Sequence, residues 1–531
     1  MLVIASANIF ADLKLNSDEL TFFKHQHICV AAGSRFEVRQ TQHEMTFYCG
    51  LSFFRQSTGT GLTGETYESR RETLKDADGY FLLAAVSGHR VACCRSLYRH
   101  HDVYYWQRGN SFIISTDLRV IVSASQTHSI DSHFLSLFIN SDSAASCMSP
   151  VSSVRKLEGG CELILEDNKF CVSKLVSVHP GSGNYLDTMS DLLKSVSERR
   201  EVYLHFSGGL DSTLIFLLLK EAGIKFTALH HDTYAFEKDS ETNLARAFCE
   251  KHGVDLHIIR PAISLSDDQC RSSHPMDCSS FFTSFSSESF SYCRLDPGKS
   301  VVLDGHGGDS LFVQNPSEKV GFELLKKGKI FSAYGKMSDL CLLKNLKLTE
   351  MLSRNTRRVF SRKGLADDRS PGHIFSQHLD PRSPQFDYLN DLINMMETRP
   401  VAGSEDYVSF SPILSLNSVR SFMSHEYAGN FSDEYDRLWI RNMLYNRFSE
   451  PCVYEKRKRP SVSTIYHLIK IQKDNISHVI ENTSLPDHAG LDKAKLRESL
   501  AYNSSVRIDE DAYRLLRLSV AHQYYASLNL A

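Results

Sequence analysis

The sequence predicts an α/β protein of two domains, and three observations lead to this prediction. The chain has 531 residues, whereas a single hydrophobic core rarely grows beyond roughly 250–300 residues. Up to about residue 178, short runs of alternating apolar and polar residues are separated by turn residues, which favours β-strands. From Tyr185 onward, strand-like and helix-like segments alternate, which is typical of a doubly wound parallel sheet.

The two domains are expected to meet near residue 180. The polar segment His179–Asn184 contains two glycines and a proline and is predicted to be a linker, so we expect domains at residues 1–178 and 179–531. After the linker, the pattern predicts strand Glu201–Phe206, helix Asp211–Ala222, strand Phe226–His230, helix Ser240–His252, strand Leu256–Ile259 and strand Val301–Leu303. From about residue 320 the pattern is mostly helical to the end.

The composition excludes several classes of protein. With 42% hydrophobic and 23% charged residues and a net charge of −3, the chain is neither disordered nor a dedicated nucleic-acid binder. Its longest apolar run, Leu214–Leu219, is far shorter than the ~20 residues of a membrane helix, and no basic secretory signal opens the sequence. The 13 cysteines include no CxxC pair, which indicates reduced thiols. We therefore expect a cytoplasmic protein without a nucleic-acid or membrane partner.

The most specific chemical signal is a predicted strand that runs directly into a glycine-rich turn and an apolar helix. The turn consists of Ser207, Gly208, Gly209, Leu210, Asp211 and Ser212. Glycines let the backbone approach a ligand closely, the helix start offers unpaired N–H groups and the positive end of its dipole, and the serines add hydroxyl donors. This combination predicts a pyrophosphate cradle. An acidic residue within such a cradle, Asp211, requires a cation beside it, and Mg²⁺ fits.

A second glycine-rich turn follows the predicted strand Val301–Leu303 and ends near Asp309. Parallel strands of one sheet place their carboxyl ends at the same edge. Asp211 and Asp309 are therefore expected to face one site and to share Mg²⁺. The P-loop and the dinucleotide-binding loop are both excluded, because neither the GxxxxGK nor the GxGxxG spacing is present.

The two turns resemble those of the asparagine synthetase family, whose ATP-cleaving domain carries SGGLDS followed by a GxGGDELF-like turn. The similarity extends over nearly the whole chain, through Gly79–Phe81, Tyr104–Ser123, Val154–Gly160, Ser411–Pro412, Pro451 and Lys456–Arg459. It implies an N-terminal glutaminase-like α+β sandwich of the Ntn type and a C-terminal ATP-pyrophosphatase domain with a doubly wound parallel sheet and a helical extension. It also implies ATP and Mg²⁺ as cofactors.

Two departures from the family pattern narrow the expected function. Glutamine-using members need Cys as residue 2, because the freed N-terminal amine activates the thiol, and here residue 2 is Leu2. The sandwich is therefore expected to be a scaffold without glutaminase activity. The position three residues before Asp309 is Glu in asparagine synthetases and Tyr in β-lactam synthetases, and here it is His306. Around this residue and over Leu204–Phe226, the sequence looks most like a lasso-peptide cyclase of the microcin type.

That resemblance implies a reaction and a set of site residues. Such a cyclase adenylates a side-chain carboxylate of a cleaved precursor, and the precursor's α-amine then attacks to close an isopeptide ring, releasing AMP and pyrophosphate. Adenine is expected near Phe206 and Leu229, and the other end of the nucleotide near Asp304 and Gly305.

Two further roles are assigned to polar side chains near the reacting groups. His306, with a reference pKa near 6.5, is a candidate base or orienting donor, with loop packing as the alternative. Lys458, with Lys456 as the alternate, is a candidate cation for the charge that develops in the reaction, with a solvated basic run as the alternative.

Other functions and partners stay open at this level. An amide ligase for a small substrate, such as a β-lactam synthetase, is one alternative, and an ATP-binding scaffold without turnover is another. The precursor peptide is the expected substrate, and a leader peptidase is an expected partner. The segment Lys326–Lys363 carries 11 basic residues against Asp339 and Glu350, which predicts either a solvated helical face or an electrostatic landing surface for an acidic partner.

Overall fold

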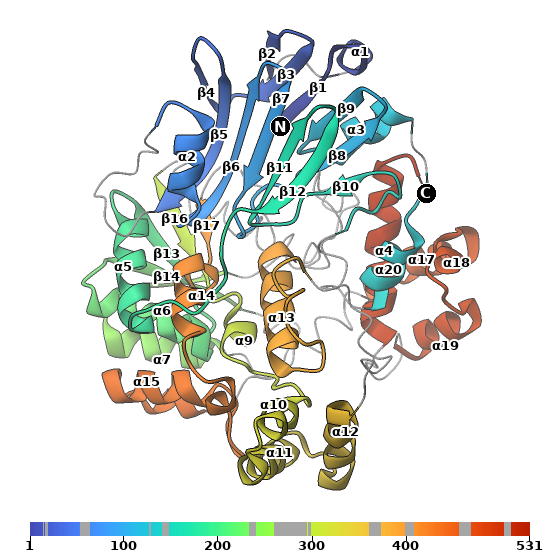
Figure 1. Cartoon of the computed structure of the whole chain (residues 1–531). Helices are drawn as coiled ribbons and strands as arrows, with labels where there is room; N and C mark the ends of the chain where they lie inside the picture. Colours follow the sequence, from blue (N-terminus) through green and yellow to red (C-terminus); the bar gives the residue numbers. More distant parts are fainter. Residues whose placement is uncertain are drawn as a thin grey trace.

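The computed structural model is a mixed α/β protein with three sheets (Figure 1). It describes residues 1–13, 15, 20–53, 64–126, 129–140, 148–232, 241–259, 295, 299–360, 373–398, 408–455, 469–503 and 511–530. Among the helices in these ranges, none has the length and apolar character needed to cross a membrane.

The N-terminal part contains two antiparallel sheets of six strands each, ordered β10-β8-β9-β1-β3-β2 and β12-β11-β7-β6-β5-β4. Their strands are β1 (Leu2–Ser6), β2 (Leu20–His25), β3 (Ile28–Gly33), β4 (Glu37–Gln40), β5 (Met45–Phe53), β6 (Asp78–Ser87), β7 (Arg90–Arg95), β8 (Tyr104–Arg108), β9 (Ser111–Ser115), β10 (Arg155–Lys156), β11 (Cys161–Glu166) and β12 (Lys169–Lys174). Four helices accompany them, namely α1 (Ala7–Phe10), α2 (Tyr67–Leu74), α3 (Leu118–Ser125) and α4 (Ser132–Asn140). The expectation of a β-rich N-terminal part is confirmed.

Strand β1 shows how the first sheet is buried on both faces. Successive side chains of a strand point to opposite faces. Leu2 and Ile4 accordingly belong to a core that also contains Phe47 of the second sheet, whereas Val3 and Ala5 belong to a separate core on the outer face. Residue 2 is thus an apolar side chain, 2% exposed, within the large core shared by the two sheets.

The outer face of the first sheet is covered by the end of the chain. The helices α17 (Lys473–Asn482), α18 (Leu485–His488), α19 (Lys493–Asn503) and α20 (Asp511–Ser527) lie beside α4 at the right of Figure 1. Their apolar residues, such as Ile476 and Leu515, share one core with Val3 and Ile113. The last helices of the chain therefore pack against the first sheet, although the two are far apart in sequence.

The third sheet is parallel throughout, with the order β15-β14-β13-β16-β17. Its strands are β13 (Glu201–His205), β14 (Phe226–His231), β15 (Leu256–Ile259), β16 (Ser300–Leu303) and β17 (Val408–Phe410), and the helices next to them in sequence are α5 (Tyr185–Ser197), α6 (Leu210–Glu221) and α7 (Thr242–His252). The predicted strands and helices of this region are confirmed within one or two residues at each end. Strand β17 interrupts the otherwise helical second half and was not expected.

The remaining helices form the lower part of the molecule in Figure 1. They are α9 (Gly308–Leu311), α10 (Val320–Lys326), α11 (Ile330–Lys344), α12 (Leu348–Phe360), α13 (Pro384–Thr398), α14 (Leu416–Phe422) and α15 (Leu438–Phe448), with short 3-10 turns η2 (Pro412–Leu414), η3 (Tyr427–Asn430) and η4 (Pro451–Tyr454). Helices α10, α11 and α12 pack around a small core of their own.

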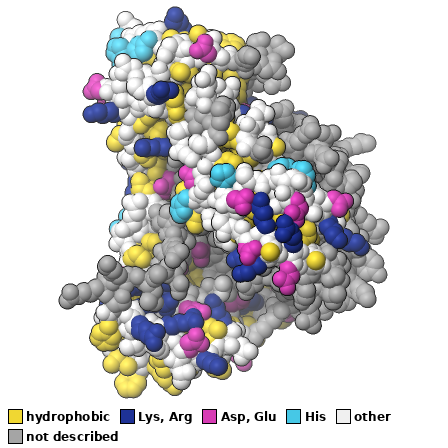
Figure 2. All heavy atoms as spheres, turned by 90° about the vertical axis from the view of Figure 1, so that its right-hand side faces the viewer, with side chains coloured by type: hydrophobic (Ala, Val, Ile, Leu, Met, Phe, Trp, Pro, Cys, Tyr) yellow, Lys and Arg dark blue, Asp and Glu magenta, His cyan; other side chains and the backbone are white. Residues whose placement is uncertain are grey.

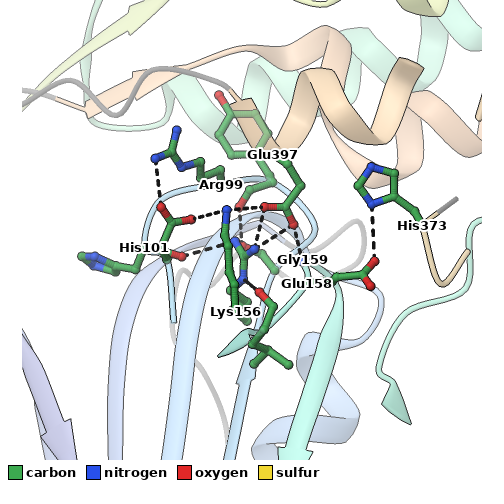
Figure 3. A network of polar contacts seen from close by, with 12 residues as sticks. Arg99, His101, Lys156, Glu158, Gly159, His373 and Glu397 are labelled. Carbon is green, nitrogen blue, oxygen red and sulfur yellow. Dashed lines mark hydrogen bonds and ion pairs between the residues drawn. The ribbon is translucent and has the colours of Figure 1, made fainter. Parts of the chain in front are cut away.

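A buried network of charged side chains joins the N-terminal sheets to α13 (Figure 3). Glu397 of α13 accepts two hydrogen bonds from Arg95 Nη2, at 2.7 and 2.6 Å, and lies 3.5 Å from Lys156 Nζ. Lys156 Nζ also lies 3.0 Å from Asp102 Oδ1, whose other oxygen accepts from Arg99 at 2.9 Å. Burial alone would raise the pKa values of both carboxyls, but the surrounding cations outweigh it and hold them below the ordinary range.

Candidate active site at the edge of the parallel sheet

The first glycine-rich turn connects β13 to α6 and is held together by its own hydroxyl groups. Ser207 Oγ lies 3.2 Å from Ser212 Oγ and accepts a hydrogen bond from Gly209 N at 3.2 Å. Gly208 has φ +77°, and no heavy atom lies within 4 Å of the position where a Cβ would be, so a ligand can approach its backbone. Helix α6 begins at Leu210 without a side-chain cap, which leaves its first N–H groups for an anion.

The second turn lies directly against the first. Strands β13 and β16 are paired in parallel, with Leu204 opposite Leu303, so both turns leave the same edge, as the sequence predicted. A Cβ on Gly308 would lie 2.3 Å from Asp211 Oδ1, and a Cβ on Gly305 would lie 2.9 Å from Ser212 N. Side chains at these positions would push the turns apart. The glycines therefore set the distance between the two predicted acidic residues.

Asp211 and Asp309 converge on a residue that the sequence reasoning missed. Arg437 Nη1 lies 2.8 Å from Asp309 Oδ1 and 3.3 Å from Asp211 Oδ2, and the arginine side chain is 5% exposed. Arg437 precedes α15 and has a left-handed backbone with φ +51°. It is 226 residues from Asp211 in sequence, so no local pattern could have pointed to it.

The position held by the guanidinium suits a divalent cation. Two carboxylates from different turns share one positive group there, and oxygen ligands of this kind are those that Mg²⁺ prefers. Asp309 is 41% exposed, whereas Asp211 is 13% exposed, so the pair is open to solvent on the Asp309 side. The two residues predicted to hold Mg²⁺ thus fit that role. With the side-chain amide of Gln314 oriented so that its nitrogen faces Asp309, this nitrogen donates to Oδ1 at 2.6 Å and to Oδ2 at 3.0 Å.

The other residues of the second turn have mainly structural contacts. Asp304 Oδ1 accepts from the backbone N–H of His306 at 3.0 Å and from the hydroxyl of Ser411. Its carboxylate therefore fixes the start of the turn and ties it to the segment after β17. His306 itself is half-buried at the tip of the turn, next to Gly307, which has φ +89° and packs against Leu414.

The residues expected near adenine lie at the ends of β13 and β14. Phe206 and Leu229 are each 1% exposed, and Phe206 N donates to Leu229 O at 2.8 Å. The ring of Phe206 packs on Phe216 with a centroid distance of 5.0 Å, so it belongs to the layer between sheet and helices. A nucleotide at this edge would meet the backbone of Phe206 rather than its ring.

Histidines also gather at this end of the strands. The Nδ1–H of His230 donates to Phe206 O at 2.8 Å, and burial lowers the pKa of His230. The ring of His231 lies 5.0 Å from that of His205, and burial lowers the pKa of His231 to about 3. Burial also lowers the pKa of His205, so these three rings are neutral near pH 7.

A cavity of about 350 Å³ adjoins the carboxylate pair, lined among others by Gln314, Arg437, Arg441 and Glu455. The chain enters the undescribed segment 456–468 directly after Glu455. The predicted lysines Lys456 and Lys458 therefore lie outside the described residues.

The chain is similar in sequence to asparagine synthases. Residues 190–399 match the family model for asparagine synthase. The microcin J25-processing protein McjC of Escherichia coli is 23% identical over 455 residues, which cover 84% of this chain and 85% of that protein.

Two solved structures align much more weakly. Glutamine phosphoribosylpyrophosphate amidotransferase from B. subtilis, in complex with ADP and GMP, aligns with 8% identity over 58% of this chain and 70% of its own, at a TM-score of 0.20. The allosteric regulatory enzyme of purine biosynthesis aligns with 7% identity over 59% of this chain and 70% of its own, also at a TM-score of 0.20.

Proposed function

This chain carries an asparagine synthase domain and is an ATP-dependent amide-forming ligase, and from this premise we propose that it closes the macrolactam ring of a lasso peptide. The ligase activates an Asp or Glu side-chain carboxylate of a ribosomally made peptide as its adenylate, with release of pyrophosphate. The N-terminal amine of the same peptide then displaces AMP and forms an isopeptide bond. The similarity to McjC over most of both chains supports a peptide substrate of this kind.

One observation carries the proposal: two glycine-rich turns bring Asp211 and Asp309 onto a single cation position beside an uncapped helix start. We assign the pyrophosphate to the backbone of Gly208 and Gly209 and to the first N–H groups of α6. Mg²⁺ held by Asp211 and Asp309 would neutralise the leaving group. Arg437 would then lose Asp211 and Asp309 as partners and keep Asp436, so that its Nη1 becomes available to the same phosphates.

The amine has to be neutral before it attacks. We assign the role of accepting the ammonium proton to the His306 imidazole, which has a reference pKa near 6.5. The backbone N–H of His306 donates to Asp304 Oδ1 at 3.0 Å, which fixes the turn that carries this residue. We assign the cation that faces the acyl oxygen to Lys458, with Lys456 as the alternate. Holding both ends of one peptide together removes most of the entropic cost of ring closure before the chemical step.

We propose that the N-terminal sandwich, residues 1–178, is a glutaminase-like scaffold of the Ntn type, and that residues 179–531 form the synthetase part. Leu2 supports the loss of glutaminase activity, because a buried aliphatic side chain stands where a nucleophile is required. The ring-forming amine then comes from the peptide and has to be free. A leader peptidase is therefore the expected partner, and an ATP-dependent reaction on a new precursor is expected in the cytoplasm.

The proposal is tested by incubating the purified chain with Mg-ATP and a synthetic core peptide that has a free N-terminus and an acidic residue several positions on. Ring closure removes the mass of one water from the peptide and releases AMP. The same peptide with an acetylated N-terminus should keep its mass, because it has no amine to attack.

Two outcomes of this incubation would overturn the proposal. Turnover of ATP only with small amino acids would identify a ligase for small substrates, and no turnover with any substrate would identify an ATP-binding scaffold. Asp211→Asn should lose AMP formation while the chain still folds, and normal activity in this variant would exclude the metal assignment.

A further inference from the structure

Helix α11 is buried on one face and exposes an apolar stripe on the other. The inner face packs against α10 and α12 through Ala333, Met337, Leu340 and Cys341. On the outer face, Phe331 is 94% exposed, Tyr334 is 54% exposed and Leu342 is 66% exposed. Their spacing along the helix places them on one side, over about 16 Å at 1.5 Å per residue. Ile330, 65% exposed, extends the stripe at its N-terminal end.

Lysines precede and follow the apolar stripe along the chain. The lysines of this segment are Lys326, Lys327, Lys329, Lys336, Lys344 and Lys347, and between the first and the last of them only Asp339 is acidic. Lys326 and Lys327 are 61% and 56% exposed and lie immediately before Ile330 and Phe331. Their ion pairs with Asp380 and Glu323 are on the surface and hold them only weakly.

The place of α11 in the molecule leaves this face open. The helix lies at the lower end of the molecule in Figure 1, opposite the end formed by β2 and β3. Figure 2 shows hydrophobic side chains gathered at that same lower end, with Lys and Arg side chains directly above them and some Asp and Glu side chains among these. An apolar stripe at the extremity of a molecule can meet a flat surface without hindrance from the rest of the chain.

We propose that the outer face of α11 binds an anionic lipid surface. A helix that carries aromatic and aliphatic side chains on one face and lysines along its rim lies in the plane of a membrane interface, with its apolar face among the acyl chains. The lysines attract anionic headgroups, and their aliphatic stems can follow the apolar surface. The proposal does not depend on the identity of the reaction.

The shape and charge of the face favour lipid over a protein partner. A protein would need a concave acidic groove to cover a protruding stripe, whereas a bilayer needs only negative headgroups above an apolar interior. The expectation of no membrane partner rested on the lack of a spanning segment, and an interfacial contact does not need one.

The proposal is tested with the full-length chain and lipid vesicles. We expect flotation with vesicles of phosphatidylcholine and phosphatidylglycerol, little flotation with phosphatidylcholine alone, and release by high salt. Phe331→Ser should weaken binding about tenfold or more, because it removes a large apolar side chain from the contact. Lys326→Glu should weaken it by at least about fivefold, as expected for a charge near the surface.

The matched control is Phe22→Ser, at an exposed phenylalanine of β2 on the opposite end of the molecule. It should bind vesicles like the unchanged chain. Phe331→Ser should keep the unfolding temperature and the rate of ATP turnover, because Phe331 is 94% exposed and belongs neither to a core nor to the candidate site.

A second readout follows the stripe directly. The chain contains only Trp106 and Trp439, so Phe331→Trp adds one exposed indole. Its emission should shift to shorter wavelength with anionic vesicles, and a Phe22→Trp variant should show no such shift. The proposal is overturned if vesicles do not bind at low salt or if binding survives Phe331→Ser. It is also overturned if Phe331→Ser and Lys326→Glu abolish a contact with an identified acidic protein while vesicles do not bind.

Discussion

At the scale of single residues, Arg437 explains how the two acidic residues of the candidate site can lie close together. Two carboxylates brought together by tight turns repel each other unless a cation lies between them. Arg437 supplies that charge from a buried position, with bonds to both Asp211 and Asp309. Arg437 thus holds the two acidic residues close together.

Removing this arginine should make stability depend on the metal. Without Mg²⁺, Arg437→Ala should lower the free energy of unfolding by about 1–3 kcal/mol, less than for a fully buried pair because Asp309 is partly exposed. Added Mg²⁺ should recover most of this loss, since it restores a cation to the same carboxylates. The measurement is thermal unfolding with and without Mg²⁺, with Arg437→Lys as the conservative variant. Equal losses under both conditions would show that Arg437 acts only through packing.

At the scale of elements, the sequence predicted the strands, turns and helix starts that are determined by residues adjacent in the chain. The strand before each turn, the glycines and the start of α6 follow from short patterns, and β13, α6 and β16 lie where they were expected. Contacts between distant segments could not be predicted. Arg437 follows an ordinary acidic stretch, and β17 has only three residues, too few for a periodic pattern. An amphipathic pattern shows that α20 has a buried face, but it does not show that the first sheet covers it.

The contact between the two turns gives a prediction for the glycines. Gly308→Ala would place a methyl group against the carboxylate of Asp211, so the turns should separate and AMP formation should fall about a hundredfold, as for other misplaced catalytic groups. The cost in stability should be about 1–3 kcal/mol, typical of overpacking.

Gly335→Ala is the control, because nothing lies within 4 Å of that Cβ position in α11. It should leave activity unchanged and raise stability by up to about 1 kcal/mol, since alanine favours the helix. If Gly308→Ala keeps full activity, the close approach of the turns is not needed for the reaction.

At the scale of the whole molecule, the N-terminal sheets and the helices below them are joined by buried charges as well as by apolar packing. The network in Figure 3 links Arg95 of β7 to Glu397 at the end of α13, a separation of 302 residues. Arg95 is 1% exposed and also donates to Leu157 O at 3.0 Å. A buried charge of this kind adds little net stability when it is paired, but it becomes very unfavourable when its partner is lost.

Glu397→Gln should therefore destabilise the chain strongly, by about 3–5 kcal/mol at pH 7, because Arg95 and Lys156 lose their shared carboxylate in a dry environment. The measurement is chemical denaturation followed at several pH values. Glu350→Gln removes an exposed carboxylate that pairs with Arg354 on α12, and it should leave the unfolding free energy nearly unchanged.

The pH dependence of unfolding separates the charge of Glu397 from its shape. The pKa of Glu397 is lowered in the folded chain, so the unfolded chain binds more protons in acid. The stabilisation is therefore present above the ordinary glutamate pKa of about 4.3 and is lost as the pH falls below it. In Glu397→Gln this part of the acid dependence should disappear, so that the difference between variant and unchanged chain shrinks toward low pH. A constant difference in unfolding free energy across the acid range would mean that the Glu397 side chain contributes through packing alone. The contact between the sheets and α13 would then not depend on its charge.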